Sequence, residues 1–186
     1  MTTIGITGSI SSGKSTVAQL ISKKKYPLFS ADKVVLNLYK KNEFVNLLIK
    51  KFNLSRKKNI KSQIKTIITK NKNKLKLLES IIHPFVRKEM NNFLKIKKKI
   101  LILEIPLLIE GKLQKHFDII IFVDAKKKLR LKRYLMKNAN EKIFEILNKR
   151  QMKPAIKKKK CNFVIINNYS LAILKKKVKN FYKNYE

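Results

Sequence analysis

Short runs of apolar residues alternate along the chain with longer segments in which Leu, Ile and Lys recur at helical spacing. A short uninterrupted apolar run is typical of a strand buried on both faces, as in parallel sheets that are covered by helices. The pattern therefore predicts an α/β fold with a doubly wound parallel sheet, whose ligand site lies at the carboxyl ends of the strands. The five predicted strands cover residues 3–7, 26–30, 99–104, 118–124 and 162–166.

Residues 33–98 separate the second and third predicted strands and contain several helix-like windows without a strand pattern. A single crossover needs far fewer residues, so we expect a helical subdomain over the site. Pro84 precedes a periodic apolar segment over residues 85–93, and we expect it in the first turn of a helix, where proline is best tolerated. The 186 residues are enough for one domain with such an insert.

A phosphate-binding loop of the Walker A type follows the first predicted strand, with the sequence Gly8-Ser9-Ile10-Ser11-Ser12-Gly13-Lys14-Ser15. In the pattern G-x-x-x-x-G-K-[ST], backbone N–H groups converge on phosphate oxygens, the lysine neutralises the β/γ charge and the next hydroxyl holds Mg²⁺. A helical segment follows, so its positive dipole end also points at the anion. The alternative is a Ser/Gly turn before an amphipathic helix. The predicted ligands of the ATP phosphates are Ser11, Ser12, Gly13, Lys14, Ser15 and Thr16.

Aspartate occurs only at Asp32, Asp118 and Asp124, so acids at strand ends are the first candidates for chemistry. Asp32 follows the second predicted strand. Glu104 ends the third and resembles a Walker B acid that orders Mg²⁺ through water. The structural alternatives are a helix cap at Asp32, before residues 33–40, and a solvent-exposed acid at Glu104.

The chain carries 46 Lys and Arg against 11 Asp and Glu, a formal net charge of +35. Such a charge is often matched to a polyanion such as nucleic acid. The positive residues here are nearly all lysine and are scattered, whereas nucleic-acid sites rely on arginine forks and interleaved aromatic residues. We therefore expect a solvated lysine surface and no specific nucleic-acid partner, and interpret the lysine run at 157–160 in the same way.

Cys161 is the single cysteine, which excludes an intrachain disulfide and a multi-cysteine metal site in this chain. A reducing, cytoplasmic setting is the expectation that follows. No segment has the length of a membrane-spanning helix, and the first residues predict a strand and not a signal peptide. We expect no membrane association.

Further short stretches follow the loop in a defined order, namely Ala31-Asp32, His83-Pro84, Pro106-Leu107-Leu108-Ile109-Glu110, Arg130 to Arg133, Gln151 and Phe163-Val164-Ile165-Ile166-Asn167. Together with the loop they resemble the dephospho-CoA kinase family over nearly the whole chain. The resemblance implies a nucleoside-monophosphate-kinase-like core, a CoA-binding insert at about 33–98 and a lid at about 130–150. It implies ATP- and Mg²⁺-dependent phosphorylation of the ribose 3′-hydroxyl of dephospho-CoA, the last step of coenzyme A synthesis.

The resemblance also implies roles for single residues. The implied catalytic residues are Lys14, Asp32 and Arg133. Asp32 would receive the proton of the attacking hydroxyl, and Arg133 would be the lid cation that stabilises the transition state together with Lys14. The amides of Gln151 and Asn167 would contact nucleotide. The alternatives are an exposed helix arginine at Arg133 and a packed helix-start histidine at His83. The expected substrate ligands are Asp32, His83, Arg87 and Glu110, and the expected metal ligands are Ser15 and, through water, Glu104.

The chain departs from the family pattern at several positions. Ser9 and Ser11 stand where glycine is usual, so Ser11 must adopt the backbone angles of the glycine that it replaces. Ser30 replaces the first acid of an Asp-Ala-Asp signature, Lys137 replaces an arginine, and Cys161-Asn162 stands for Ala-Asp. Because lysine lacks the bidentate fork of arginine, we expect a working but slower enzyme. We also expect the protein to be a monomer.

Two other functions stay open at this point. A different small-molecule P-loop kinase, acting on a nucleoside or nucleotide, would keep the loop and the sheet but would bind no CoA precursor. A nucleic-acid-binding NTPase would use the positive charge, and its affinity for DNA or RNA would fall steeply with salt.

Overall fold

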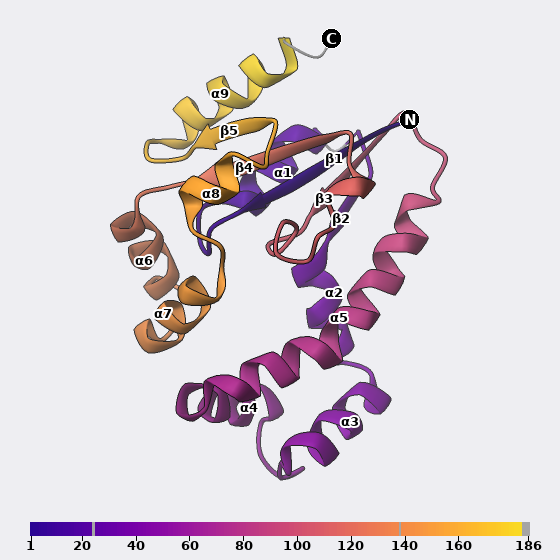
Figure 1. The fold of residues 1–186 in the computed structure, drawn as a ribbon, viewed down its shortest axis with the longest axis vertical. Coiled ribbons are helices and arrows are strands. Elements are labelled where there is room, and N and C mark those ends of the chain that lie inside the picture. The colour runs from indigo at the N-terminus through magenta and orange to yellow at the C-terminus, as the bar shows by residue number, and fades with distance from the viewer. Residues whose placement is uncertain (24, 138, 184–186) are drawn as a thin grey trace. The chain divides into compact units, whose positions relative to one another are not determined.

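The computed structural model describes residues 1–23, 25–137 and 139–183 (Figure 1). The chain divides into two compact units, of which the first combines Met1–Ser30 with Ile96–Glu186 and the second is Ala31–Lys95. The strands of the described residues all belong to the first unit, and the second unit is helical. Among the described residues, no helix is both long and apolar enough to cross a bilayer.

The first unit is built on a parallel sheet with the strand order β2-β3-β1-β4-β5. The prediction of five parallel strands is confirmed, and each strand lies within two residues of its predicted bounds. β1 is the central strand, so its carboxyl end opens in the middle of the sheet edge where such folds bind ligands. The strands are β1 (Thr2–Gly8), β2 (Leu28–Ser30), β3 (Ile100–Glu104), β4 (Ile119–Asp124) and β5 (Phe163–Ile166).

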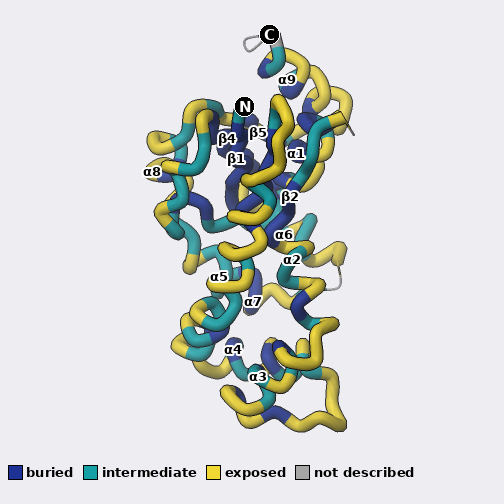
Figure 2. Tube along the Cα trace, turned by 90° about the vertical axis from the view of Figure 1, so that its right-hand side faces the viewer, coloured by how far each residue is buried: buried dark blue, intermediate teal, exposed yellow. Residues whose placement is uncertain are grey.

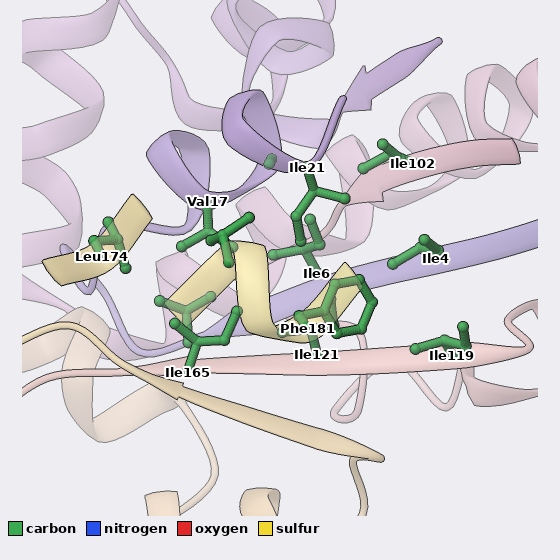
Figure 3. Packing of buried hydrophobic residues seen from close by; sticks show 13 residues of the cluster. Ile4, Ile6, Val17, Ile21, Ile102, Ile119, Ile121, Ile165, Leu174 and Phe181 are labelled. Carbon is green, nitrogen blue, oxygen red and sulfur yellow. The ribbon is translucent and has the colours of Figure 1, made fainter. Parts of the chain in front are cut away.

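Two helices cover one face of this sheet, α1 (Lys14–Ser22) and α9 (Leu171–Lys183). Their apolar side chains meet alternate residues of the strands in one buried cluster (Figure 3). Burial of branched side chains in such a cluster stabilises the fold by about 1.5–3 kcal/mol each. Members of the cluster include Ile4, Ile6, Val17, Ile21, Ile121, Ile165, Leu174 and Phe181.

The opposite face of the sheet is covered by the chain after β3. Gly5 makes this approach possible, because a Cβ there would lie 2.7 Å from Leu108 and 2.9 Å from Phe117. A 3₁₀ turn (Gln114–His116) then leads into β4. At the far end of the strands, the Asp118 carboxylate accepts hydrogen bonds from the Thr3 amide (2.7 Å) and hydroxyl (2.8 Å), and these bonds hold the pKa of Asp118 below its usual range.

Three further helices complete the first unit, α6 (Lys127–Leu135), α7 (Glu141–Arg150) and α8 (Pro154–Lys158). α6 and α7 pack together through the rings of Tyr134 and Phe144, whose centroids are 5.5 Å apart. The strands are mostly buried, whereas the outer sides of the helices are exposed (Figure 2).

The second unit consists of α2 (Ala31–Leu38), α3 (Asn42–Phe52), α4 (Ile60–Lys70) and α5 (Lys72–Leu94). Its core is a separate apolar cluster in which the ring of Phe44 meets Tyr39 and Phe85 edge-on, with centroids 5.4 and 5.6 Å apart. Its buried residues include Leu38, Leu48, Ile64, Ile68, Leu75, Leu78 and Met90. That this unit binds CoA stays a prediction.

Pro84 lies in the middle of the 23-residue helix α5, so the prediction of a helix start at this position is wrong. Proline removes one backbone donor and crowds the carbonyl of Ser80, four residues earlier. The helix nevertheless continues, because apolar residues on both sides of the proline are buried in the unit core, among them Leu78 and Met90. Tertiary packing here outweighs a local preference.

We expect Pro84→Ala to raise the free energy of unfolding by about 1–2 kcal/mol, since alanine restores a donor and relieves the crowding inside the helix, partly offset by a more flexible unfolded chain. Urea denaturation measures the change. Pro154→Ala is the matched control, because Pro154 lies in the first turn of α8 and its removal should bring no gain. A Pro84→Ala protein no more stable than the wild type would contradict this account of α5.

Candidate functional site

The phosphate loop joins the end of β1 to the start of α1, and close backbone packing fixes its glycines. A Cβ at Gly8 would lie 2.2 Å from the Val123 carbonyl oxygen. Gly13 has φ +95°, and a Cβ there would lie 2.3 Å from Asn167 Nδ2. Ser11 has φ +55°, so the expectation that it takes a left-handed, glycine-like conformation is confirmed.

Lys14 is the first residue of α1 and is buried against the loop that precedes it. Its Nζ donates to the carbonyl oxygen of Ser9 at 3.0 Å, so the ammonium lies along the loop backbone. Ser15 and Thr16 follow in the first turn of the helix and are exposed. A cation and two hydroxyls thus lie in the first turn of a helix, at its N-terminus, which favours binding of a polyphosphate.

Glu104 is the last residue of β3 and connects three elements of the site. Its Oε1 accepts a hydrogen bond from Ser15 Oγ at 2.6 Å, and its Oε2 accepts one from Ser30 Oγ at 3.1 Å. The residue is only 3% exposed, so the alternative of a solvent-exposed strand-end acid is wrong. The carboxylate and the Ser15 hydroxyl are hard oxygen donors, which is the chemistry that Mg²⁺ prefers.

No group of three or more His, Cys, Asp and Glu side chains capable of holding a metal occurs among the described residues. An all-protein metal cage is therefore not part of this site. The pair of Ser15 and Glu104 fits an ion that keeps several waters and takes its other ligands from substrate phosphates, as Mg²⁺ does.

Asn167 and Gln151 contact the loop backbone through their amides. Asn167 Nδ2 donates to the Ser12 carbonyl oxygen at 2.9 Å. Gln151 Oε1 accepts from the Ile10 amide at 2.8 Å. The expectation was a direct contact of these amides with nucleotide, whereas the structure places both against the backbone that would hold it.

Arg133 lies on α6 and is half-buried, so the alternative of an exposed helix arginine is wrong. Its Nη2 donates to the Asn167 carbonyl oxygen at 3.0 Å. Its Nη1 is buried and has no hydrogen-bond partner within the described part of the chain. The guanidinium is thus anchored on one side beside the residue that supports the loop.

Glu110 forms an ion pair with the buried side chain of Lys157. Lys157 Nζ lies 3.0 Å from both carboxylate oxygens and also donates to the Pro106 carbonyl oxygen at 2.8 Å. Burial lowers the pKa of Lys157, and the adjacent Glu110 carboxylate offsets part of this shift. The carboxylate also accepts from the Met152 amide at 2.9 Å. Both carboxylate oxygens of Glu110 thus accept hydrogen bonds from within the protein.

The interpretation of residues 157–160 as a solvated run is wrong at its first member, because Lys157 is 1% exposed. Lys158 forms an ion pair with Asp124 at 2.9 Å. Neighbouring residues of a helix point to different sides, so α8 buries Lys157 and leaves Lys158 partly exposed. Cys161 follows, and burial raises the pKa of its thiol to about 11, which disfavours the thiolate form.

Asp32, His83 and Arg87 belong to the second unit. α2 begins at Ala31, so Asp32 lies in the first turn of this helix, where an acid interacts favourably with the helix dipole, and the helix-cap interpretation of Asp32 stays an alternative. His83 is half-buried and Arg87 exposed, one turn apart on α5. Because α5 begins at Lys72, His83 is not a helix-start residue.

Sequence reasoning missed the structural roles of Arg130 and Lys157. Arg130 is 4% exposed, and its Nη1 donates to the Ile10 carbonyl oxygen of the loop at 3.3 Å. Both residues look like surface cations in so basic a chain. Their positions in the sequence were the only available signal. Arg130 lies one turn into the helix after β4, and Lys157 lies one turn after Pro154.

The central strand of the parallel sheet leads through a phosphate loop, with glycine at each end, into a helix that begins with Lys14 and Ser15. This combination defines a P-loop kinase fold. The shikimate kinase of Bacteroides thetaiotaomicron shares this fold, with a TM-score of 0.58 at 10% identity over 99% of this chain and 98% of the other. The predicted fold class is therefore confirmed.

The comparisons also resolve the family. The family model for dephospho-CoA kinase matches residues 2–172. The dephospho-CoA kinase of Bartonella henselae is 35% identical over 172 residues, 89% of this chain and 88% of the relative. The solved dephospho-CoA kinase of Campylobacter jejuni has 25% identity and a TM-score of 0.69, covering 98% and 96% of the two chains. The chain belongs to the dephospho-CoA kinase family.

Replacing Glu110 separates a structural role from a role in substrate binding. We expect Glu110→Gln to lower the free energy of unfolding by about 2–3 kcal/mol, because Lys157 is then left buried without its counter-charge. Glu145→Gln is the control, since it breaks the Lys127–Glu145 pair (2.8 Å) at the surface and should change stability by less than about 0.5 kcal/mol. Unchanged stability with a raised KM for the acceptor would instead identify Glu110 as a substrate ligand.

Proposed function

We propose that the protein transfers the γ-phosphate of ATP to the 3′-hydroxyl of dephospho-CoA. Family membership supports the reaction, and the observation that carries it structurally is the Glu104 carboxylate between the hydroxyls of Ser15 and Ser30, beside the phosphate loop. Phosphoryl transfer requires mainly position and neutralisation of charge. The carboxylate and the Ser15 hydroxyl offer oxygen donors for a metal cation, and Lys14 in the adjacent loop supplies positive charge.

The loop would hold the phosphates of ATP through backbone N–H groups of residues 11–16. Lys14 would exchange its neutral partner, the Ser9 carbonyl oxygen, for the β- and γ-phosphate oxygens. This exchange is favourable because the phosphate oxygens carry negative charge, so the ammonium gains a Coulomb attraction that the carbonyl oxygen does not offer.

Ser15 would ligate Mg²⁺ directly and Glu104 through water. When bound, Mg²⁺ neutralises charge on the β- and γ-phosphates. The hydrogen bond between Ser15 and Glu104 orients both oxygen donors.

Asp32 is the proposed acceptor of the proton from the attacking hydroxyl. The Ser30 hydroxyl donates to Glu104, so the end of β2 lies beside the metal ligands, and Asp32 follows two residues later in the chain. The 3′-oxygen forms a bond to the γ-phosphorus, its proton passes to Asp32, and the bond from the γ-phosphorus to the bridging oxygen breaks to release ADP.

The remaining assignments concern four further residues, the cellular compartment and the oligomeric state. Arg133 would stabilise charge in the transition state as part of a lid over about 130–150, and His83 with Arg87 would contact the phosphates of the acceptor. The contacts of Glu110 favour a structural role. We further propose a cytoplasmic monomer without a specific nucleic-acid partner, because the excess charge is scattered lysine.

A panel of acceptors tests the reaction. Purified protein with ATP and Mg²⁺ is offered dephospho-CoA, AMP, a nucleoside or shikimate, and the products are separated by chromatography and identified by mass. We expect phosphorylation of dephospho-CoA alone, and none by Lys14→Ala. Saturating oligonucleotide at physiological salt should leave the rate unchanged. Turnover of a different acceptor, or ATP hydrolysis stimulated by the oligonucleotide, would overturn the proposal.

Asp32→Asn tests the base. We expect kcat to fall roughly 10²-fold or more, with KM for ATP retained, because an amide cannot accept the proton. Glu43→Gln is the matched control, since Glu43 is the acid in the first turn of α3 and its loss removes a similar favourable interaction with a helix dipole. Its kcat should equal that of the wild type. A fully active Asp32→Asn enzyme would exclude Asp32 as the base.

A further inference from the structure

The peptide groups of Ile10, in the middle of the phosphate loop, are held from two sides. The Ile10 amide donates to Gln151 Oε1 at 2.8 Å, and its carbonyl oxygen accepts from Arg130 Nη1 at 3.3 Å. Gln151 Nε2 also donates to the Gly8 carbonyl oxygen at 3.4 Å. Both side chains come from the α6–α7 region, far along the sequence from the loop.

Arg130 is itself fixed before it contacts the loop. Its Nε donates to the Ala125 carbonyl oxygen at 3.0 Å, and its Nη1 donates to Asn148 Oδ1 on α7 at 2.9 Å. The guanidinium lies 5.8 Å from the ring centroid of Phe144. A side chain restrained in this way loses little further entropy when it bonds the loop.

Gln151 is restrained through its neighbour in the chain. It follows directly after α7, and the Met152 amide donates to the partly buried Glu110 carboxylate at 2.9 Å. Lys157 holds that carboxylate in turn. The two side chains on either side of Ile10 are therefore both supported by the interior of the first unit.

The loop needs such support at this point. Ser11, the next residue, has φ +55°, a conformation that serine disfavours and that its neighbours must impose. The N–H groups proposed to bind phosphate begin at Ser11, and Ile10 sets the direction in which they point.

We propose that Arg130 and Gln151 are positioning residues that hold the Ile10 backbone, and thereby keep the phosphate loop in its ATP-binding conformation. The inference rests on the proposed kinase function, in which the loop binds ATP. It assigns Gln151 a role through the loop in place of a direct contact with nucleotide. It also makes the α6–α7 region a support for the loop at its base.

The test is Gln151→Met, which keeps the length of the side chain and removes its hydrogen bonds. Since apparent affinity falls with the fraction of loops in the competent conformation, we expect KM for ATP to rise about tenfold, with KM for the acceptor unchanged. Arg130→Met acts on the other side of Ile10 and should shift the same parameter. Because both residues restrain one backbone segment, the double variant should raise KM by less than the product of the two single effects.

Asn140→Ala is the matched control, because it removes the side-chain cap of α7, in which Asn140 Oδ1 accepts from the Ile143 amide at 3.4 Å. Asn140 touches neither Arg130 nor the loop in any hydrogen bond of the described residues. A merely structural role for the region predicts that all three single variants lower the melting temperature and leave KM for ATP near the wild-type value. That outcome, or an equal rise in KM for ATP in Asn140→Ala, would overturn the proposal. If Gln151→Met does not fold, Arg130→Met against Asn140→Ala decides by the same criterion.

Calorimetric binding of ADP to the same variants keeps this test separate from the test of the reaction. A wild-type protein that binds ADP but does not phosphorylate dephospho-CoA would refute the proposed acceptor. The loop inference would then be decided by the ADP affinities of the variants alone. Equal ADP affinity in the wild type, Gln151→Met and Arg130→Met would refute the loop inference, whatever the acceptor is.

Discussion

The site depends on one buried carboxylate, that of Glu104. It accepts hydrogen bonds from the hydroxyl at the start of α1 and from the hydroxyl at the end of β2. A buried negative charge is costly unless donors or a cation compensate it, so these hydroxyls are drawn to the same edge of the sheet. A single carboxylate thereby connects the helix that follows the phosphate loop with β2, the strand that precedes Asp32. Ser15, the proposed metal ligand, is one of its two donors.

Acids are scarce in this chain, and four of those in the first unit serve its framework. Asp118 joins the start of β4 to β1, Asp124 pairs with Lys158, and Glu110 pairs with a lysine in the interior. Glu104 is the fourth. Acids at strand ends are therefore engaged in the framework of the unit. Of these four carboxylates, only that of Glu104 accepts a hydrogen bond from the phosphate-loop motif among the described residues, and its donor is Ser15.

The sheet and the loop could be predicted from sequence because their signals are local. Uninterrupted apolar runs marked the strands, and the glycine spacing marked the loop. The left-handed backbone of Ser11 was predicted from the resemblance to the family, in which glycine is usual at that position. The predictions of a helix start at Pro84 and of a solvated side chain at Lys157 were wrong, since the environments of both residues are set by packing partners distant in sequence. The contact of Gln151 with Ile10 joins residues 141 positions apart, and no single sequence carries a signal for it.

The most direct test of the account is the Mg²⁺ dependence of phosphoryl transfer in Glu104→Gln. The amide keeps the size of the side chain and removes the charge that would order the ion. We expect the Mg²⁺ concentration for half-maximal rate to rise about tenfold or more, as is common when a partner of a metal ligand is lost. Glu145→Gln, at the surface, should titrate like the wild type. A Glu104→Gln enzyme with the wild-type Mg²⁺ midpoint would contradict the central role given to this carboxylate.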